Sequence, residues 1–181
     1  MYSLRIDPAM LAEFAPLLEY PNDESLAMAV GLHRKLEAVC PDAAEPMGLF
    51  VAELQGLTTD ELEEIHTRTF SLSPICAAYI GVQLFGENNF KRGEFIAQLA
   101  SEFGRHGLDF RWELPDHLSC MLRLLPVLPA SEQEELLAYC LTKGAAGIAG
   151  QLESTTSAYR HLVRAIHLVL SRLEMEVTSN A

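Results

Sequence analysis

Two helical segments of the chain meet at the stretch Trp112-Glu113-Leu114-Pro115-Asp116-His117-Leu118, which an apolar run to Leu128 follows. A proline fixes its own φ and pushes the preceding residue out of the helical region, so a helix is expected to begin near Pro115. Asp116 then falls in the first turn of that helix, where the helix dipole and free N–H groups favour a carboxylate. The junction therefore places rigid backbone, charge and an imidazole between two helices.

Outward from this junction, apolar residues recur at helical spacing and strand-like alternation is absent. Pro, Gly and Asp residues divide these apolar patterns into short segments. The sequence predicts an all-α fold, a single-domain bundle of about eight or nine helices over residues 1–181 with a frayed tail at 177–181. The helices are predicted to begin near Pro8, Leu26, Ala43, Thr58, Pro74, Arg92, Pro115, Ser131 and Thr155.

Two helix starts carry the signature of a capping box, in which a Ser or Thr side chain and a Glu three residues later exchange hydrogen bonds. The first pair is Thr58 with Glu61, and the second is Ser131 with Glu134. Asp7 before Pro8 is a further start signal. These positions should fix helix starts by local interactions alone.

The most apolar segment of the chain follows Ser73-Pro74 and ends at Gly86, which predicts a central helix surrounded by others. The small-residue segment Gly144–Gly150 indicates either a break or a close contact between helices. A last helix is predicted over Thr155–Met175, with one apolar face.

The chain is acidic, with 13 Lys and Arg against 25 Asp and Glu and a net charge of −12. This balance argues against nucleic acid or an anionic membrane surface as the main partner and would attract a basic peptide. Solubility alone explains such a charge equally well. No apolar run approaches the roughly 20 residues that a membrane span needs, so no membrane partner is expected.

Four cysteines are widely spaced and form no CxxC pair, so they are expected to be buried thiols of a cytoplasmic protein: Cys40, Cys76, Cys120 and Cys140. Cys120 follows His117 by three residues, which leaves a thiolate role open as the less favoured alternative. Phosphate-binding loops and repeated metal-ligand motifs are absent, and Glu63 with His66 is a single Glu-x-x-His pair. We therefore expect no enzyme activity, no metal and no cofactor.

A binding surface remains as the main functional hypothesis, because aromatic and aliphatic residues flank interrupted helices of an acidic body. One junction is flanked by Phe70, Leu72, Pro74 and Tyr79, and another by Phe110, Trp112, Leu114 and Pro115. Each set is either a piece of the core or a groove for an amphipathic helix.

The chain resembles the cytoplasmic redox-enzyme maturation chaperones, that is, the nitrate reductase assembly chaperones of the NarJ type and their TorD and DmsD relatives. The resemblance covers about residues 60–128 and rests on the order and spacing of the following segments: Thr69-Phe70-Ser71-Leu72-Ser73, Tyr79, Leu84-Phe85-Gly86, Lys91-Arg92-Gly93, His106-Gly107-Leu108 and Glu113 to Leu118. Glu113, Pro115, Asp116 and His117 match the family's E-x-P-D-H-like stretch, and Phe70 matches the aromatic residue that ends its Y-x-x-(L/T)-F segment. His66 stands where that segment usually has Tyr or Trp.

The resemblance implies a helical chaperone that binds the N-terminal, often twin-arginine, leader peptide of a molybdopterin-containing oxidoreductase subunit until the cofactor is inserted. Asp116 would be a charge partner for the leader, and His117 a hydrogen bonder or a brace of the helix junction. The expected peptide-binding residues are Phe70, Leu72, Tyr79, Phe85, Trp112, Glu113, Pro115, Asp116 and His117. The chain would act as a monomer or homodimer, and the alternative is a helical structural subunit of an oxidoreductase complex.

Overall fold

The computed structural model describes residues 6–71 and 74–179. Within these residues the fold is all-α, as predicted, and no strand forms. The helices are α1 Leu11–Leu18, α2 Ser25–Val39, α3 Pro41–Leu54, α4 Thr59–Phe70, α5 Ile80–Phe85, α6 Phe90–Arg105, α7 Leu118–Leu124, α8 Ala130–Leu136, α9 Thr142–Glu153 and α10 Tyr159–Thr178. The 3-10 turns η1 (Pro8–Met10) and η2 (Leu125–Val127) adjoin α1 and α7, and the π-helical turn η3 (Leu137–Leu141) joins α8 to α9.

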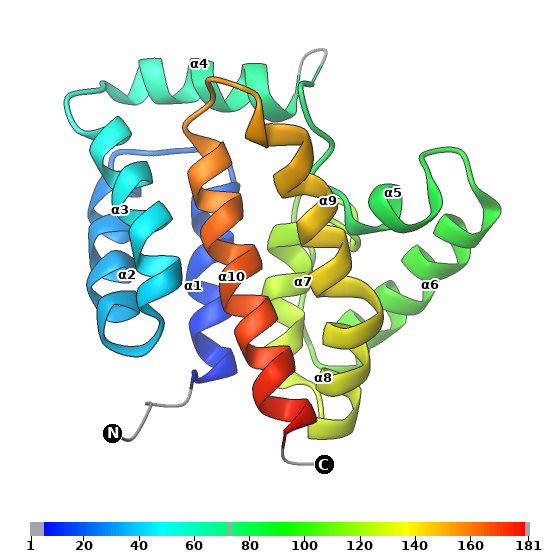
Figure 1. The fold of residues 1–181 in the computed structure, drawn as a ribbon. Helices are drawn as coiled ribbons and strands as arrows, with labels where there is room; N and C mark the ends of the chain where they lie inside the picture. Colours follow the sequence, from blue (N-terminus) through cyan, green and yellow to red (C-terminus); the bar gives the residue numbers. More distant parts are fainter. Residues whose placement is uncertain (1–5, 72–73, 180–181) are drawn as a thin grey trace.

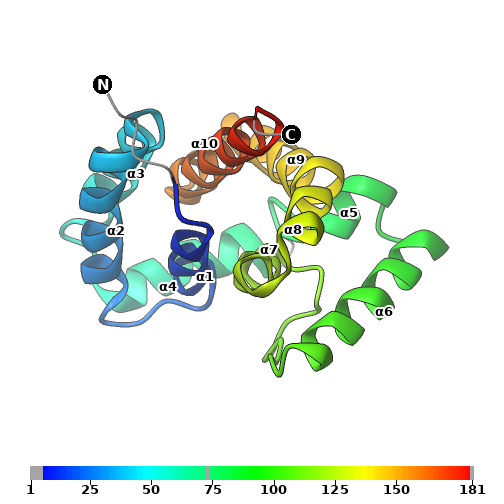
Figure 2. The ribbon, with the colours of Figure 1, turned by 90° about the horizontal axis from the view of Figure 1, so that it is seen from below.

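α10 lies in the middle of the molecule and packs against α3 on one side and α9 on the other (Figure 1). α2 packs on α3, α1 packs on α7, and α4 crosses one end of the bundle (Figure 1). α5 and α6 form an arm at the opposite edge from α2, and α6 stands away from the body when the molecule is seen from below (Figure 2). The predicted inner face of α10 is buried and consists of Leu162, Ile166, Val169, Leu170 and Leu173.

Local interactions set several helix ends as predicted. Thr58 and Glu61 form the capping box at the start of α4, with the Thr58 N–H donating to Glu61 Oε2 at 2.8 Å. Asp7 caps η1 by accepting the N–H of Ala9 at 2.9 Å. Gly86 ends α5 with a φ of 86°, a left-handed conformation that glycine adopts without steric cost.

The helix predicted to begin after Pro74 begins only at Ile80. The residues before it pair instead with the loop that precedes α7: the Ile80 N–H donates to the Asp116 carbonyl and the Leu118 N–H to the Ala78 carbonyl, each at 2.8 Å. Tyr79 and His117 thereby form an isolated antiparallel bridge. The predicted central helix is therefore wrong: α5 lies beside α6 at one edge of the molecule (Figure 2), and only Ile80 and Gly81 of it are buried.

The helix predicted to begin near Pro115 begins at Leu118, with His117 as its N-cap. A turn in which the His117 N–H donates to the Leu114 carbonyl at 2.9 Å occupies the preceding residues. Asp116 therefore lies outside the first turn of α7, and the helix dipole does not explain it. Pro115 therefore lies within a turn and not at the first position of a helix.

The capping box predicted for Ser131 and Glu134 is absent, because α8 already begins at Ala130 behind Pro129 and has no side-chain cap. The last helix begins later than predicted, at Tyr159, and extends to Thr178. None of the described helices is both long and apolar enough to cross a bilayer.

The Gly144–Gly150 segment lies within α9 and makes a close helix contact, the second of the two predicted alternatives. A Cβ atom on Gly144 would lie 2.7 Å from Ile80 Cδ1, and one on Gly147 would lie 2.8 Å from Gln83 Oε1. These two glycines let α5 approach α9 closely, which fixes the base of the α5–α6 arm.

Candidate functional site

Two loops form a buried corner between the α5–α6 arm and the rest of the bundle. The segment 76–79 precedes α5, the segment 113–117 precedes α7, and the Tyr79 to His117 bridge joins them. We call Tyr79, Glu113, Pro115, Asp116 and His117 the Pro-Asp-His corner. All five belong to the predicted peptide-binding set.

Asp116 is fully buried and forms a bidentate ion pair with Arg92 in the first turn of α6. Arg92 Nε donates to Oδ2 at 2.9 Å and Nη2 to Oδ1 at 3.4 Å. Gly81 makes room for this pair, since a Cβ atom there would lie 2.5 Å from Asp116 Oδ2. Both carboxylate oxygens are thus engaged inside the molecule, and Asp116 holds α6 against the corner.

His117 braces the start of α7. Its Nδ1 accepts the Ser119 N–H at 3.2 Å and lies 2.7 Å from Ser119 Oγ, which leaves the ring proton on Nε2. Burial lowers the pKa of His117 to about 4, against the opposing effect of the nearby Glu113 and Asp116 charges. The imidazole is therefore neutral at physiological pH and acts as a helix cap.

Tyr79 joins the buried part of the corner to Glu113, which is partly exposed. Its hydroxyl donates to Glu113 Oε2 at 2.6 Å, and its ring packs edge-on against the His117 ring at 5.1 Å between centroids. The Arg92 guanidinium lies over the same ring, with Cζ 5.4 Å from the centroid. Burial and the bond to Glu113 raise the pKa of Tyr79, so its hydroxyl remains a donor.

Phe70 lies outside the corner, in an aromatic cluster at the end of α4. Its ring packs edge-on against His66 at 5.3 Å and against Tyr159 at 5.0 Å. His66 is buried, its Nε2 donates to the Leu18 carbonyl at 3.1 Å, and burial lowers its pKa. His66 thus fills a place among aromatic rings, while the predicted Leu72 lies outside the described residues.

Phe85 lies at the end of α5 and packs against Phe95 of α6, with ring centroids 5.7 Å apart. It joins the two helices of the arm and is only partly buried. Phe85 therefore lies close to Tyr79 in the sequence, but its ring contact is with Phe95 of α6.

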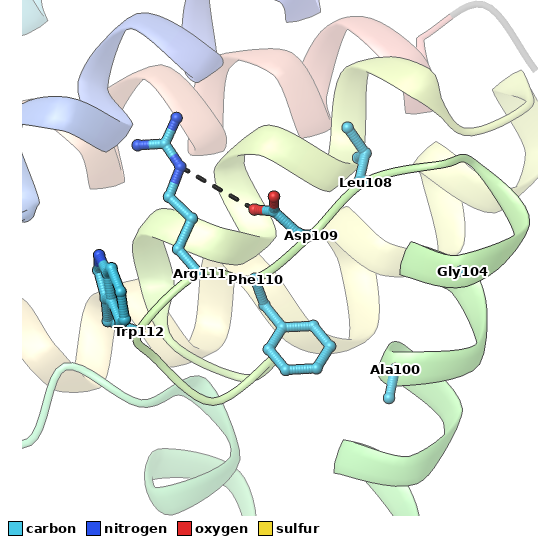
Figure 3. A pocket seen from close by; sticks show the side chains of 7 residues that line it. All are labelled: Ala100, Gly104, Leu108, Asp109, Phe110, Arg111 and Trp112. Carbon is cyan, nitrogen blue, oxygen red and sulfur yellow. Dashed lines mark ion pairs between the residues drawn. The ribbon is translucent and has the colours of Figure 1, made fainter.

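Trp112 is 98% exposed and borders a hollow with a volume of about 710 Å³ (Figure 3). The hollow lies between the loop after α6 and the face of that helix that carries Ala100 and Gly104, and we call it the Trp112 hollow. Its lining consists of Ala100, Gly104, Leu108, Asp109, Phe110, Arg111 and Trp112. Phe110 points toward Ala100 in Figure 3 and forms part of the apolar floor.

Ion pairs fix the loop that carries Trp112. Arg111 Nη1 lies 2.9 Å from Glu19 Oε2 of the segment after α1, and Arg111 adopts a φ of 54°, unusual for a residue with a side chain. Arg123 Nη1 donates to the Asp109 carbonyl at 3.2 Å. Trp112 and Phe110 were predicted from the sequence, whereas Asp109 and Arg111 were not; the Glu19 partner of Arg111 lies far away in the chain.

The described residues give no sign of an activated nucleophile or metal centre. Burial raises the pKa of the Cys120 thiol and raises that of Cys76 to about 12, so both are protonated at neutral pH. The four cysteines are unpaired. No group of three or more His, Cys, Asp or Glu side chains in the described part of the chain is arranged to hold a metal ion.

Comparison with known proteins gives matches in sequence and in structure, and no family model matches. Nitrate reductase molybdenum cofactor assembly chaperone NarJ from Escherichia coli K12 is 26% identical over 126 residues, which cover 66% of this chain and 52% of the relative; the O157:H7 protein matches equally. The chain thus spans about half the length of these curated relatives. A crystal structure of a putative redox enzyme maturation protein from Archaeoglobus fulgidus superposes with a TM-score of 0.62, at 23% identity, over 92% of this chain and 95% of that one.

The sequence similarity to the NarJ relatives is confined to about half of their length. The fold is that of the Archaeoglobus protein over nearly its whole length. The predicted peptide-binding residues that the structure describes divide into three groups: the buried corner, the exposed Trp112, and Phe70 and Phe85 in separate aromatic contacts. Their direct contact with a peptide stays a prediction.

Proposed function

We propose that this chain is a cytoplasmic maturation chaperone that binds the N-terminal, twin-arginine-like segment of a molybdoenzyme catalytic subunit. It holds that subunit until the molybdenum cofactor is inserted, and a nitrate reductase is the first candidate client. The chain itself makes and breaks no covalent bond in this role.

The observation that carries the proposal is the match to NarJ over 126 residues, whose printed name describes a nitrate reductase molybdenum cofactor assembly chaperone. The fold match to a redox enzyme maturation protein supports the same class of function. The similarity to NarJ is one of sequence, and the similarity to the Archaeoglobus protein is one of structure.

The electrostatics of the chain also support a basic client segment. A net charge of −12 attracts a peptide that carries arginines and speeds their encounter at low ionic strength. The protonated thiols of Cys76 and Cys120 fit a binding protein better than a thiolate enzyme.

Calorimetric titration with synthetic N-terminal peptides of molybdoenzyme catalytic subunits tests the proposal. We expect one of them to bind with a Kd in the micromolar range, about −8 kcal/mol, tight enough to hold and weak enough to release. A peptide in which both arginines are replaced by glutamine is the matched control and should bind more weakly. Absence of binding by every peptide at low ionic strength would rule the proposal out.

A further inference from the structure

α6 separates two hollows that open on different sides of the helix. Ala100 and Gly104 line the Trp112 hollow, whereas Phe95, Leu99 and Glu102 share another face of α6 at helical spacing. That second face borders a groove of about 510 Å³ between α6 and the α7, α8 and η3 run. We call it the α6–α8 groove, and Figure 2 shows α6 standing apart from α7 and α8.

The floor of the α6–α8 groove is apolar. Its lining residues are Phe95, Gln98, Leu99, Glu102, Arg105, Leu124, Leu128, Glu132, Glu135, Leu136, Tyr139 and Cys140. Leu99, Leu124 and Leu128 are buried at its base, while Tyr139 stands 75% exposed at its edge. An exposed aromatic side chain beside an apolar floor is typical of a surface that a partner covers.

A rare backbone feature forms one wall of the groove. Tyr139 and Cys140 belong to the π-helical turn η3 between α8 and α9. Such turns are uncommon and occur frequently at functional sites, because the widened turn redirects side chains. Here it coincides with the exposed ring of Tyr139.

The rim of the groove is negatively charged, with three glutamates against one arginine. Arg105 lies 2.9 Å from Glu102 Oε1 and 3.8 Å from Glu132 Oε1. Glu135 is exposed and forms no ion pair with any residue that the structure describes. Glu102 Oε2, by contrast, is buried and lies 3.9 Å from His106 Nε2. Glu135 is therefore the rim carboxylate with acceptor capacity left for an incoming cation.

We infer that the α6–α8 groove binds the apolar face of a basic amphipathic helix, whose arginine or lysine side chains pair with the rim glutamates. In the proposed function, on which this identification rests, the helix is the client's N-terminal segment. The groove follows α6 from Phe95 to Arg105, roughly 15 Å of helix axis, so it accommodates about three turns of a bound helix.

The two other surfaces suit such a helix less well. Asp116 in the Pro-Asp-His corner is fully buried and already holds Arg92. The Trp112 hollow contributes one acidic and one basic side chain, Asp109 and Arg111. A second copy of this chain is disfavoured as the occupant, because it would bring a net charge of −12 to an acidic rim.

Substitutions of Glu135 and Tyr139, each compared with a control substitution, test the inference with little risk to the fold. Glu135→Lys reverses a charge in the groove, and Glu134→Lys makes the same change on an exposed neighbour that does not line it. Tyr139→Ala removes the aromatic edge, and Tyr139→Phe retains it. The two groove variants should weaken binding about fivefold to tenfold, and each control less than about twofold.

The probe is a designed peptide of three turns with leucines on one face and arginines on the other, alongside the best client-derived peptide, both without tryptophan. Trp112 is the chain's only tryptophan and borders the other hollow, so its emission should stay unchanged when the groove fills. The charge effect should shrink at high ionic strength. Equal affinities within the variant pairs, or no binding of the designed helix, would overturn the inference.

The outcomes separate this inference from the proposed function. If client peptides bind with a blue-shifted Trp112 emission and no effect of Glu135→Lys, the chaperone proposal stands and the groove assignment falls. If only the designed helix binds, and does so in a Glu135-dependent manner, the groove stands and the proposed client class falls.

Discussion

Arg92 and Asp116 form a bidentate ion pair that is shielded from water: the aspartate side chain is 0% exposed, the arginine side chain 13%. The pair joins the first turn of α6 to the loop before α7, across 24 residues of sequence. It gives Asp116 a definite structural role at the place where a peptide-binding carboxylate was expected. The α5–α6 arm, and with it both hollows, depends on this contact.

Removal of either partner should destabilise the protein strongly. Asp116→Ala leaves Arg92 as an uncompensated, nearly buried charge, and such changes cost about 3–5 kcal/mol. Urea unfolding followed by circular dichroism measures the loss. The control is Glu64→Ala, which breaks the exposed pair of Glu64 with Arg68 and should cost less than about 1 kcal/mol. A loss below about 1 kcal/mol for Asp116→Ala would show that the pair is not formed in solution.

Gly81→Ala should destabilise the corner by about 1–3 kcal/mol, because the new methyl group would lie 2.5 Å from Asp116 Oδ2 and 3.0 Å from Arg92 Cγ. Gly31→Ala in α2 is the matched control, since nothing lies within 4 Å of its added Cβ atom. That change should stabilise the helix by about 0.5–1 kcal/mol. Thermal unfolding of the two variants should therefore show midpoints that shift in opposite directions.

Stability should fall as the pH drops from about 6.5 to about 4. The folded-state pKa of His117 is lowered from 6.5 to about 4, so the unfolded chain binds more protons than the folded chain in this window. Protonation therefore favours unfolding, by up to about 3 kcal/mol at pH 4 relative to neutral pH. The lowered pKa of His66 adds a loss of the same sign.

His117→Asn isolates the contribution of His117, because asparagine caps a helix without titrating. The variant should show a shallower decline of unfolding free energy between pH 6.5 and pH 4 than the wild type. Identical pH profiles would mean that His117 is not buried as a neutral cap.

Tyr79→Phe removes the hydroxyl that donates to Glu113 at 2.6 Å and should cost about 1–2 kcal/mol, since the acceptor is charged and the site partly buried. Tyr20→Phe removes an exposed hydroxyl that donates to Glu63 at 3.1 Å and should cost less. Chemical unfolding measures both. Equal losses would contradict the assignment of Tyr79 as a link between corner and surface.

The sequence predicted several features that depend on neighbouring residues, although the Ser131 and Glu134 capping box and the helix start at Pro115 were wrong. The capping box of Thr58 and Glu61, the Asp7 cap and the glycine that ends α5 each involve residues within a few positions, and all were predicted. The apolar face of α10 followed from its period alone.

Features that depend on distant residues could not be predicted in the same way. The segment before α5 is held by backbone hydrogen bonds to a loop 36 positions later, as Ile80 and Asp116 show. The Arg92 to Asp116 pair likewise has no local signal. Glu134 was assigned to a helix cap, whereas the neighbouring Glu135 borders a groove that appears only when α6 and α8 are brought together.

The most direct test of the central claim uses the whole client. A molybdoenzyme catalytic subunit without its cofactor should be captured by this chain when its N-terminal segment is present, and the same subunit without that segment should be captured at least tenfold less, about 1.4 kcal/mol. Equal capture of the two forms, or capture of neither, would contradict the account.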